Sequence, residues 1–196
     1  FIPSVYYRYK VNGFTSVVVP LNDTTLLTTT QNLSNDQSAG LEMIFSAKAG
    51  SFFSANLSTN IFYNKINASN LGYIKNKSIY SGTVNLNSTF TLTKSTMLQL
   101  SGNYRSARLT PQGHIDPTIV FNTGVRQDFA NNKLSVTLTA SDLFRSLRQR
   151  SEISTPYLEQ VSLNRRDGLI VYLGVSYRFG VVKKAKEEKL QFDESL

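Results

Sequence analysis

The chain has 196 residues, of which 17% are charged, and it contains neither Trp nor Cys. This composition excludes a disordered chain, and the short aliphatic runs exclude a spanning helix, which needs roughly 18 apolar residues. The lack of Cys excludes disulfides, thiolate metal sites and thiol catalysis. The net charge of +8 is concentrated in arginines at segment ends and not in one continuous groove, so we expect no nucleic-acid partner.

Period-two alternation of apolar and polar residues recurs along the chain, and each run predicts a strand. The predicted strands span, in chain order, residues 3–12, 24–33, 37–48, 51–64, 78–91, 96–108, 118–129, 133–144, 148–164 and 169–179. Residues tolerant of positive φ at 48–51, 130–133 and 165–168 predict tight hairpins. Longer connections fall at 64–77 and 107–117. The sequence therefore predicts an antiparallel meander.

The polar face of these runs distinguishes a membrane barrel from a soluble β-sandwich. It carries mainly Ser, Thr, Asn and Gln, whereas the outer face of a soluble sheet usually carries many charges. The runs also reach the roughly 9 to 11 residues that cross the hydrocarbon layer. We therefore expect an all-β fold, an antiparallel meander of about ten transmembrane strands that forms part of an outer-membrane β-barrel. The side chains expected to face the lumen are Glu42, Asn56, Asn60, Asn85, Gln99 and Asn103.

Aromatic residues fall near the ends of the predicted strands, as in the girdles that mark the two interfaces of a membrane barrel. The residues that we assign to such a girdle are Tyr63, Tyr80, Tyr104, Phe129 and Phe144.

The last run ends in Tyr177-Arg178-Phe179-Gly180, which resembles the terminal assembly signal of outer-membrane barrels. Its expected signal residues are Leu169, Val171, Leu173, Val175, Tyr177 and Phe179. The stretches 103–113, 128–138 and 141–144 are similar to the C-terminal barrel of TonB-dependent receptors, and most similar to the outer membrane protein beta-barrel family within them. The resemblance covers nearly the whole chain and is strongest from Leu98 to Gly180.

The resemblance implies a barrel of about 22 strands, filled by an N-terminal plug that engages a TonB-type energy coupler. Residues 1–180 would be the C-terminal portion of that barrel, and residues 181–196 a charged periplasmic tail. Because the chain starts inside a predicted strand, we expect the plug and the remaining strands to precede it. The other implied partners are outer-membrane lipid and the barrel-assembly machinery.

Orientation raises a conflict. With the end of the last strand in the periplasm, alternation makes 142–148 a periplasmic turn and places 130–133 outside. The long connection 107–117 then becomes periplasmic, against the rule that periplasmic turns are short. We retain a periplasmic C-terminus, and one miscounted strand would reverse the other assignments.

Candidate chemical sites are sparse. His114 is the only histidine and lies beside Asp116 without a second imidazole or thiolate, so we expect a loop residue, no metal site, no cofactor and no catalysis. Glu42 is expected to form an interior salt bridge or to touch a plug or substrate. The arginines at 145–150 and 165–166 either pair with lipid phosphates or anionic sugars, or lie in solvated turns.

The leading functional hypothesis is the barrel wall of an outer-membrane TonB-dependent receptor that imports a nutrient such as a metal chelate or a glycan. One alternative is a non-transporting structural or adhesive barrel, or a passive porin, which would lack a plug. A third hypothesis is a soluble β-sandwich that acts as a binding module.

Overall fold

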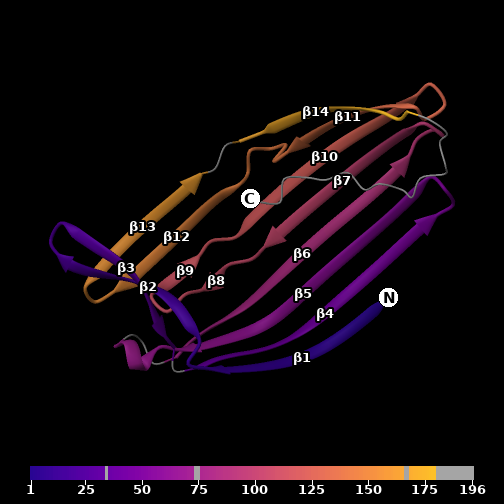
Figure 1. Cartoon of the computed structure of the whole chain (residues 1–196). Helices are drawn as coiled ribbons and strands as arrows, with labels where there is room; N and C mark the ends of the chain where they lie inside the picture. The colour runs from indigo at the N-terminus through magenta and orange to yellow at the C-terminus, as the bar shows by residue number, and fades with distance from the viewer. Residues whose placement is uncertain (34, 73–75, 166–167, 180–196) are drawn as a thin grey trace.

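The computed structural model describes residues 1–33, 35–72, 76–165 and 168–179 (Figure 1). The predicted tail at 181–196 and the middle of the predicted hairpin at 165–168 lie outside the described residues. Eight strands form one antiparallel sheet, here called the main sheet. In spatial order they are β1 (Ile2–Val11), β4 (Asn35–Ala49), β5 (Phe53–Asn67), β6 (Lys77–Thr91), β7 (Thr96–Arg105), β10 (Thr118–Phe129), β11 (Leu134–Ser141) and β14 (Ile170–Tyr177).

The other strands continue the main sheet beyond one of its ends and are here called the extension (Figure 1). β2 (Phe14–Asn22) pairs with β3 (Thr25–Asn32). A four-stranded sheet has the order β13-β12-β9-β8. Its strands are β8 (Arg108–Leu109), β9 (Gly113–Ile115), β12 (Arg148–Thr155) and β13 (Leu158–Arg165). A single 3₁₀ turn, η1 (Ser69–Leu71), precedes β6.

Each part of the extension prolongs a hairpin of the main sheet. β1 and β4 pair as far as Val11 and Asn35, and the same two chain segments pair again as β2 and β3. β7 and β10 continue in this way as β8 and β9, and β11 and β14 continue as β12 and β13. At the other end of the main sheet, the short connections 50–52, 92–95 and 130–133 join neighbouring strands.

The short connections owe their tightness to backbone with positive φ. Gly50 has φ of 55°, and Ala130, Asn131 and Asn132 have φ of 49°, 55° and 66°. Glycine adopts this region at no steric cost, and asparagine tolerates it better than most residues. The hairpins predicted at 48–51 and 130–133 are therefore confirmed.

The all-β antiparallel meander is confirmed. The main sheet is curved but not closed, with β1 and β14 as its edges, and it therefore forms part of a barrel as predicted. Two predicted strands are wrong in their boundaries or place. The segment 24–33 corresponds to β3, which pairs with the unpredicted β2 outside the main sheet. The segment 148–164 contains β12 and β13, separated by a turn at Pro156 and Tyr157.

The prediction of a turn at 142–148 is also wrong. β11 continues through this segment into β12 without reversing, and the reversal comes at Pro156 and Tyr157. Because β12 continues β11, and their partners β13 and β14 are each antiparallel to them, β13 and β14 run in the same direction. The tight hairpin predicted at 165–168 is therefore wrong as well. The connection 107–117 contains the β8–β9 hairpin and lies at the extension end. Because Tyr177 pairs with Leu134, the end of β14 lies beside the short connection 130–133. The conflict over orientation arose from this one miscounted strand.

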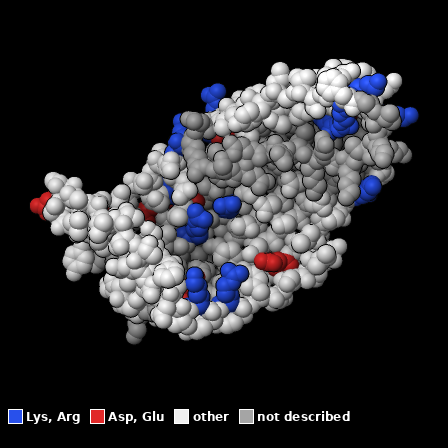
Figure 2. Space-filling view, viewed as in Figure 1, with Lys and Arg blue, Asp and Glu red and all other residues white. Residues whose placement is uncertain are grey.

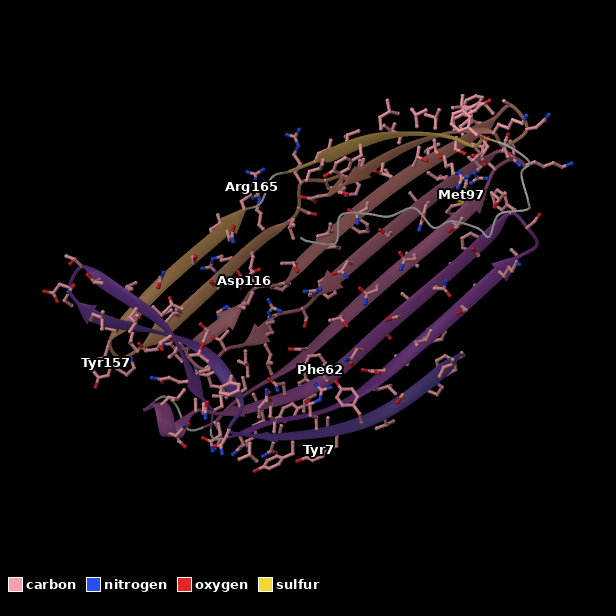
Figure 3. All side chains as sticks on the ribbon, in the orientation of Figure 1. Tyr7, Phe62, Met97, Asp116, Tyr157 and Arg165 are labelled. Carbon is pink, nitrogen blue, oxygen red and sulfur yellow. The ribbon has the colours of Figure 1, made fainter. Side chains whose placement is uncertain are left out.

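The register of the main sheet separates two kinds of side chain. One row of paired residues crosses five strands at Met43, Thr59, Val84, Tyr104 and Ile119. The adjacent row, whose side chains point to the opposite face, is Glu42, Asn60, Thr83, Arg105 and Thr118. We call these the apolar face and the polar face. The sheet curves so that the polar face is hollowed, and Phe62 points into the hollowed side whereas Tyr7 points away from it (Figure 3).

A cluster of buried apolar side chains lies where the main sheet meets the extension. Leu33, Ile66 and Ala68 form a small apolar cluster against which Leu71 and Leu109 pack. Along the apolar face, in contrast, large side chains are exposed: Val5 is 81% exposed and Leu173 is 70% exposed. A contiguous exposed apolar surface of this kind marks contact with a partner or a lipid phase. Within the described residues, no helix is both long and apolar enough to cross a membrane.

Candidate functional site

All six residues predicted to face the lumen lie on the polar face, because each pairs across the sheet with another residue of that face. Asn60 Nδ2 donates to Glu42 Oε1 at 3.4 Å, and Tyr6 Oη donates to Asn60 Oδ1 at 3.2 Å. Asn103 Nδ2 donates to Asn85 Oδ1. Among the described residues Glu42 contacts an amide and forms no salt bridge, whereas its contact with a plug or a substrate stays a prediction.

The remaining two predicted residues differ in exposure. Asn56 Oδ1 accepts a hydrogen bond from Ser46 Oγ at 2.8 Å and is exposed, whereas Gln99 is buried. Uncharged polar groups that bond to one another across strands suit the interior surface of a barrel.

A compact loop at 142–147, here called the junction loop, connects β11 of the main sheet to β12 of the extension. Its organising residue is Asp142, which is 1% exposed and has φ of 49°. Asp142 Oδ1 accepts hydrogen bonds from the Ser146 N–H at 2.8 Å and from Ser146 Oγ at 3.1 Å, and Oδ2 accepts one from the Leu147 N–H at 3.2 Å. The carboxylate therefore closes the loop on itself.

The junction loop is also bonded to β10. The Asp142 N–H donates to Asn122 Oδ1 at 2.9 Å, and the Leu143 N–H donates to the Phe121 carbonyl at 2.8 Å. The Phe144 ring packs edge-on against Phe121, with 5.5 Å between ring centroids. The loop is consequently a fixed connection between the main sheet and the extension.

Charged residues of the extension form a chain of contacts across β9 and β12. His114 Nε2 lies 3.2 Å from Asp116 Oδ1, and Arg150 contacts both Asp116 Oδ2 at 3.0 Å and Glu152 Oε2 at 3.2 Å. The hydrogen bond from Arg150 lowers the pKa of Asp116 below its usual value, and the positive charge of Arg150 acts in the same direction against the effect of desolvation. Among the described residues no group of three or more His, Cys, Asp or Glu gathers in a way that would hold a metal ion.

Gln112 connects the two parts of the extension. Its side chain is 4% exposed and forms both hydrogen bonds of a strand partner with Val18: Nε2 donates to the Val18 carbonyl at 2.6 Å, and Oε1 accepts from the Val18 N–H at 2.7 Å. The Gln112 carbonyl accepts from the Ser154 N–H at 2.9 Å. The β2–β3 hairpin is thereby held against the four-stranded sheet.

A cavity of about 450 Å³, here called the hollow, opens on the polar face where β6, β7 and β10 approach the extension. Figure 2 shows basic side chains within the hollowed side of the molecule, and Asp116 lies at the boundary between the main sheet and the extension (Figure 3). The polar residues that line the hollow are Asn85, Asn87, Ser101, Asn103, Arg105, Ser106, Arg108, Asp116, Thr118, Asn122 and Gln149.

Sequence reasoning found only part of this site. It selected Asn85 and Asn103 but not Arg105, although the same alternation along 96–108 places Arg105 on the polar face. No signal marked Gln112, whose partner is 94 residues away.

The five predicted girdle residues lie at both ends of the main sheet. Tyr63 and Tyr80 are adjacent toward the extension end, with ring centroids 5.1 Å apart, and Tyr104 lies toward the same end. Phe144 follows in the junction loop, whereas Phe129 ends β10 beside a short connection. Phe129 is joined at that end by a second aromatic group, in which Phe53 and Phe90 contact at 4.9 Å and Phe1 stacks on Phe45 at 4.5 Å.

The spacing of the two aromatic groups corresponds to a membrane. Tyr63 follows Phe53 by ten positions on β5. At about 3.3 Å per residue this spans about 33 Å along the strand. A strand tilt of about 40° reduces the span to about 25 Å along the membrane normal, which is the height of the apolar band of a membrane barrel.

The residues of the predicted assembly signal lie in and around β14. Val171, Leu173, Val175 and Tyr177 belong to the strand and share its apolar face, whereas Leu169 precedes it and Phe179 follows it. Phe179 packs edge-on against Tyr177, with ring centroids 4.8 Å apart. Among the strands that the structure describes, β14 pairs on one side only, as an edge of the main sheet.

A single-layer antiparallel sheet with one polar and one apolar face, and with aromatic groups bounding the apolar face, defines the wall of a membrane β-barrel. Residues 1–177 match the outer membrane protein beta-barrel family, and the chain belongs to this family. The family places the chain in the outer membrane. Searches among curated proteins and among solved structures found no match.

Proposed function

We propose that the chain forms part of the barrel wall of a TonB-dependent receptor that imports a nutrient, such as a metal chelate or a glycan, across the outer membrane. The observation that carries this proposal is the division of the eight-stranded sheet into a polar hollowed face and an exposed apolar face. Such a sheet separates lipid from a polar interior, and the resemblance of 103–113, 128–138 and 141–144 to such receptors supports the more specific role.

The open main sheet supports a wide barrel. β1 and β14 each present an unpaired edge among the described residues, and a lipid-exposed edge costs several kcal/mol per unsatisfied backbone group. Eight strands that curve without meeting fit a barrel of higher strand number, whose interior is wide enough for a plug. We propose that further strands of the same protein pair with both edges, and that a plug engaging a TonB-type coupler contacts the polar face.

We propose that the end of β14 and the short connections lie in the periplasm, and that the extension lies outside the cell. The connections 50–52, 92–95 and 130–133 lie at the same end as Tyr177, and short turns are typical of the periplasmic side. The exposed edge of β14 is suited to strand pairing with the barrel-assembly machinery. We also propose that the chain is a wall and not an enzyme, and that it has no nucleic-acid partner.

Energy-dependent uptake tests the transport role. Cells that make the intact protein are compared with cells lacking it, each with and without a functional TonB-type coupler, and the uptake of labelled chelates and oligosaccharides is measured. We expect one solute to enter only when both the protein and the coupler are present. Uptake that requires the protein but not the coupler would indicate a passive porin and would contradict the proposal.

A further inference from the structure

Among the described residues, the lining of the hollow carries more positive charge than its carboxylate neutralises. Arg105 ends β7 on the polar face and Arg108 begins β8 three positions later, and both side chains are exposed. Neither guanidinium has an ion-pair or hydrogen-bond partner among the described residues. Asp116 is the one carboxylate among the lining residues that the structure describes, and it is bound to Arg150 and His114.

Uncharged donors and acceptors surround these two arginines. Asn87 on β6 and Gln149 on β12 both line the hollow, and both residues are exposed. Each amide supplies a donor and an acceptor, which is the combination that hydroxyl groups require. Val120 and Leu147 contribute aliphatic surface to the same lining.

The walls of the hollow are fixed before any ligand arrives. Asn122 lines the hollow and also accepts the N–H of Asp142, and Leu147 lines it from the junction loop that the Asp142 carboxylate closes. The parts of the lining that belong to β10 and to the junction loop are therefore connected by hydrogen bonds. A site whose shape is set in advance loses less entropy when it binds.

We propose that the hollow binds a small hydroxyl-bearing anion, a sugar acid or a sugar phosphate, with the anionic group between Arg105 and Arg108 and the hydroxyls on Asn87 and Gln149. Guanidinium forks match the geometry of carboxylates and phosphates. A volume of about 450 Å³ lies within the range of small-molecule sites. This inference rests on the proposed function and names the chemical class of a solute that the protein recognises.

Titration calorimetry on the intact protein, purified from outer membranes in detergent, tests the proposal. The probes are D-glucuronate, D-glucose 6-phosphate, neutral D-glucose, and acetate and inorganic phosphate as anions without a sugar ring. We expect glucuronate or glucose 6-phosphate to bind at least about tenfold more tightly than glucose and than the corresponding simple anion. Comparison of the two sugar anions distinguishes carboxylate from phosphate.

Variants assign the binding to the hollow. Arg105→Gln and Arg108→Gln are each expected to weaken binding by about tenfold or more. Arg105→Lys keeps the positive charge but loses the forked guanidinium, so its affinity should lie between those of the wild type and of Arg105→Gln. Arg148→Gln is the matched control, because Arg148 is exposed on β12 but does not line the hollow. Heat-dependent gel mobility verifies that each variant retains a folded barrel.

Two results would overturn the inference. The first is that neither sugar anion binds more tightly than glucose, in which case the arginines face another part of the protein. The second is that Arg148→Gln weakens binding as much as Arg105→Gln. Neither result decides the proposed transport role, because coupler-dependent uptake of a different solute would leave that role intact.

Discussion

The Asp142 carboxylate accepts the backbone N–H of Ser146 at 2.8 Å, and this contact closes the loop through which β11 passes from the main sheet into the extension. The backbone leaves the extended conformation within this loop, where Asp142 and Arg145 have positive φ of 49° and 53°. The chain nevertheless continues into β12 in the direction of β11. The buried Asp142 carboxylate thus accepts three hydrogen bonds from residues four and five positions ahead in the chain, and these bonds fix the shape of the junction loop.

Asp142→Ala is expected to destabilise the protein by about 2 to 4 kcal/mol, because it leaves the Ser146 and Leu147 N–H groups without their charged acceptor. Asp142→Asn keeps one acceptor oxygen and should cost less. Chemical unfolding of the intact protein in micelles measures the effect, with the exposed Asp23→Asn as control. Equal stability of Asp142→Ala and the wild type would contradict this account of the junction loop.

Gly113→Ala is expected to disrupt the pairing of β9 with β12. A Cβ atom at Gly113 would lie 1.8 Å from the Glu152 carbonyl oxygen, and backbone atoms cannot yield as a flexible side chain does. Limited proteolysis should then cut the extension faster while the barrel keeps its heat-dependent mobility. Gly174→Ala is the control, since the nearest atoms to its Cβ lie 3.9 Å away.

Gln112→Ala is expected to release the β2–β3 hairpin from the four-stranded sheet. The substitution removes both hydrogen bonds to Val18 and leaves the N–H and the carbonyl of this half-buried residue without these partners, at a local cost of about 1 to 3 kcal/mol each. Hydrogen exchange at the Val18 amide should accelerate by at least about tenfold. Gln31→Ala on β3 is the matched control, and unchanged exchange in Gln112→Ala would show that the hairpin is held by other contacts.

The interaction of Asp116 with Arg150 has a defined pH dependence. Because Arg150 lowers the pKa of Asp116 in the folded state, the contact stabilises the extension above the ordinary aspartate pKa and is lost as the pH falls through the lowered value. Arg150→Gln should return the Asp116 pKa toward its usual value, as followed by carboxyl NMR in micelles. Arg148→Gln should leave the titration unchanged, and a parallel shift in both variants would argue against a direct contact.

Adjacent residues on β5 test which face meets lipid. Leu57 lies on the apolar face and Ser58 on the polar face. Leu57→Lys places a charge toward the hydrocarbon and should cost about 2 to 4 kcal/mol of folding free energy in bilayers, whereas Ser58→Lys should have little effect. Unfolding in lipid vesicles provides the comparison. Equal costs for the two variants would contradict the assignment of the apolar face to lipid.

Alternation along the sequence predicted the faces of the main sheet because side-chain direction in a strand is a local property. All six polar residues, from Glu42 to Asn103, lie on one face for that reason. Strand pairing is not local. The residues of 142–148 favour a turn, and only the pairing of β12 with β9 and β13 shows that the chain continues.

The candidate site was predicted less completely than the fold. The hollow is lined by β6, β7 and β10 on one hand and by β12 on the other, and the junction loop connects the main sheet to β12. Alternation placed Arg105 on the correct face, but the proximity of Gln149 comes from a segment that was predicted as one long strand. Side chains that meet across distant segments leave no periodic pattern in the sequence.

The turn between β12 and β13 is self-contained. The Thr155 hydroxyl accepts the Leu158 N–H at 3.0 Å, and Tyr157 is 85% exposed at the tip of the hairpin (Figure 3). Substitution or insertion at this tip alters an exposed end of the extension and leaves the wall pairing intact. We therefore expect residues 156–157 to be a position where this chain accepts an inserted epitope or a fluorophore readily.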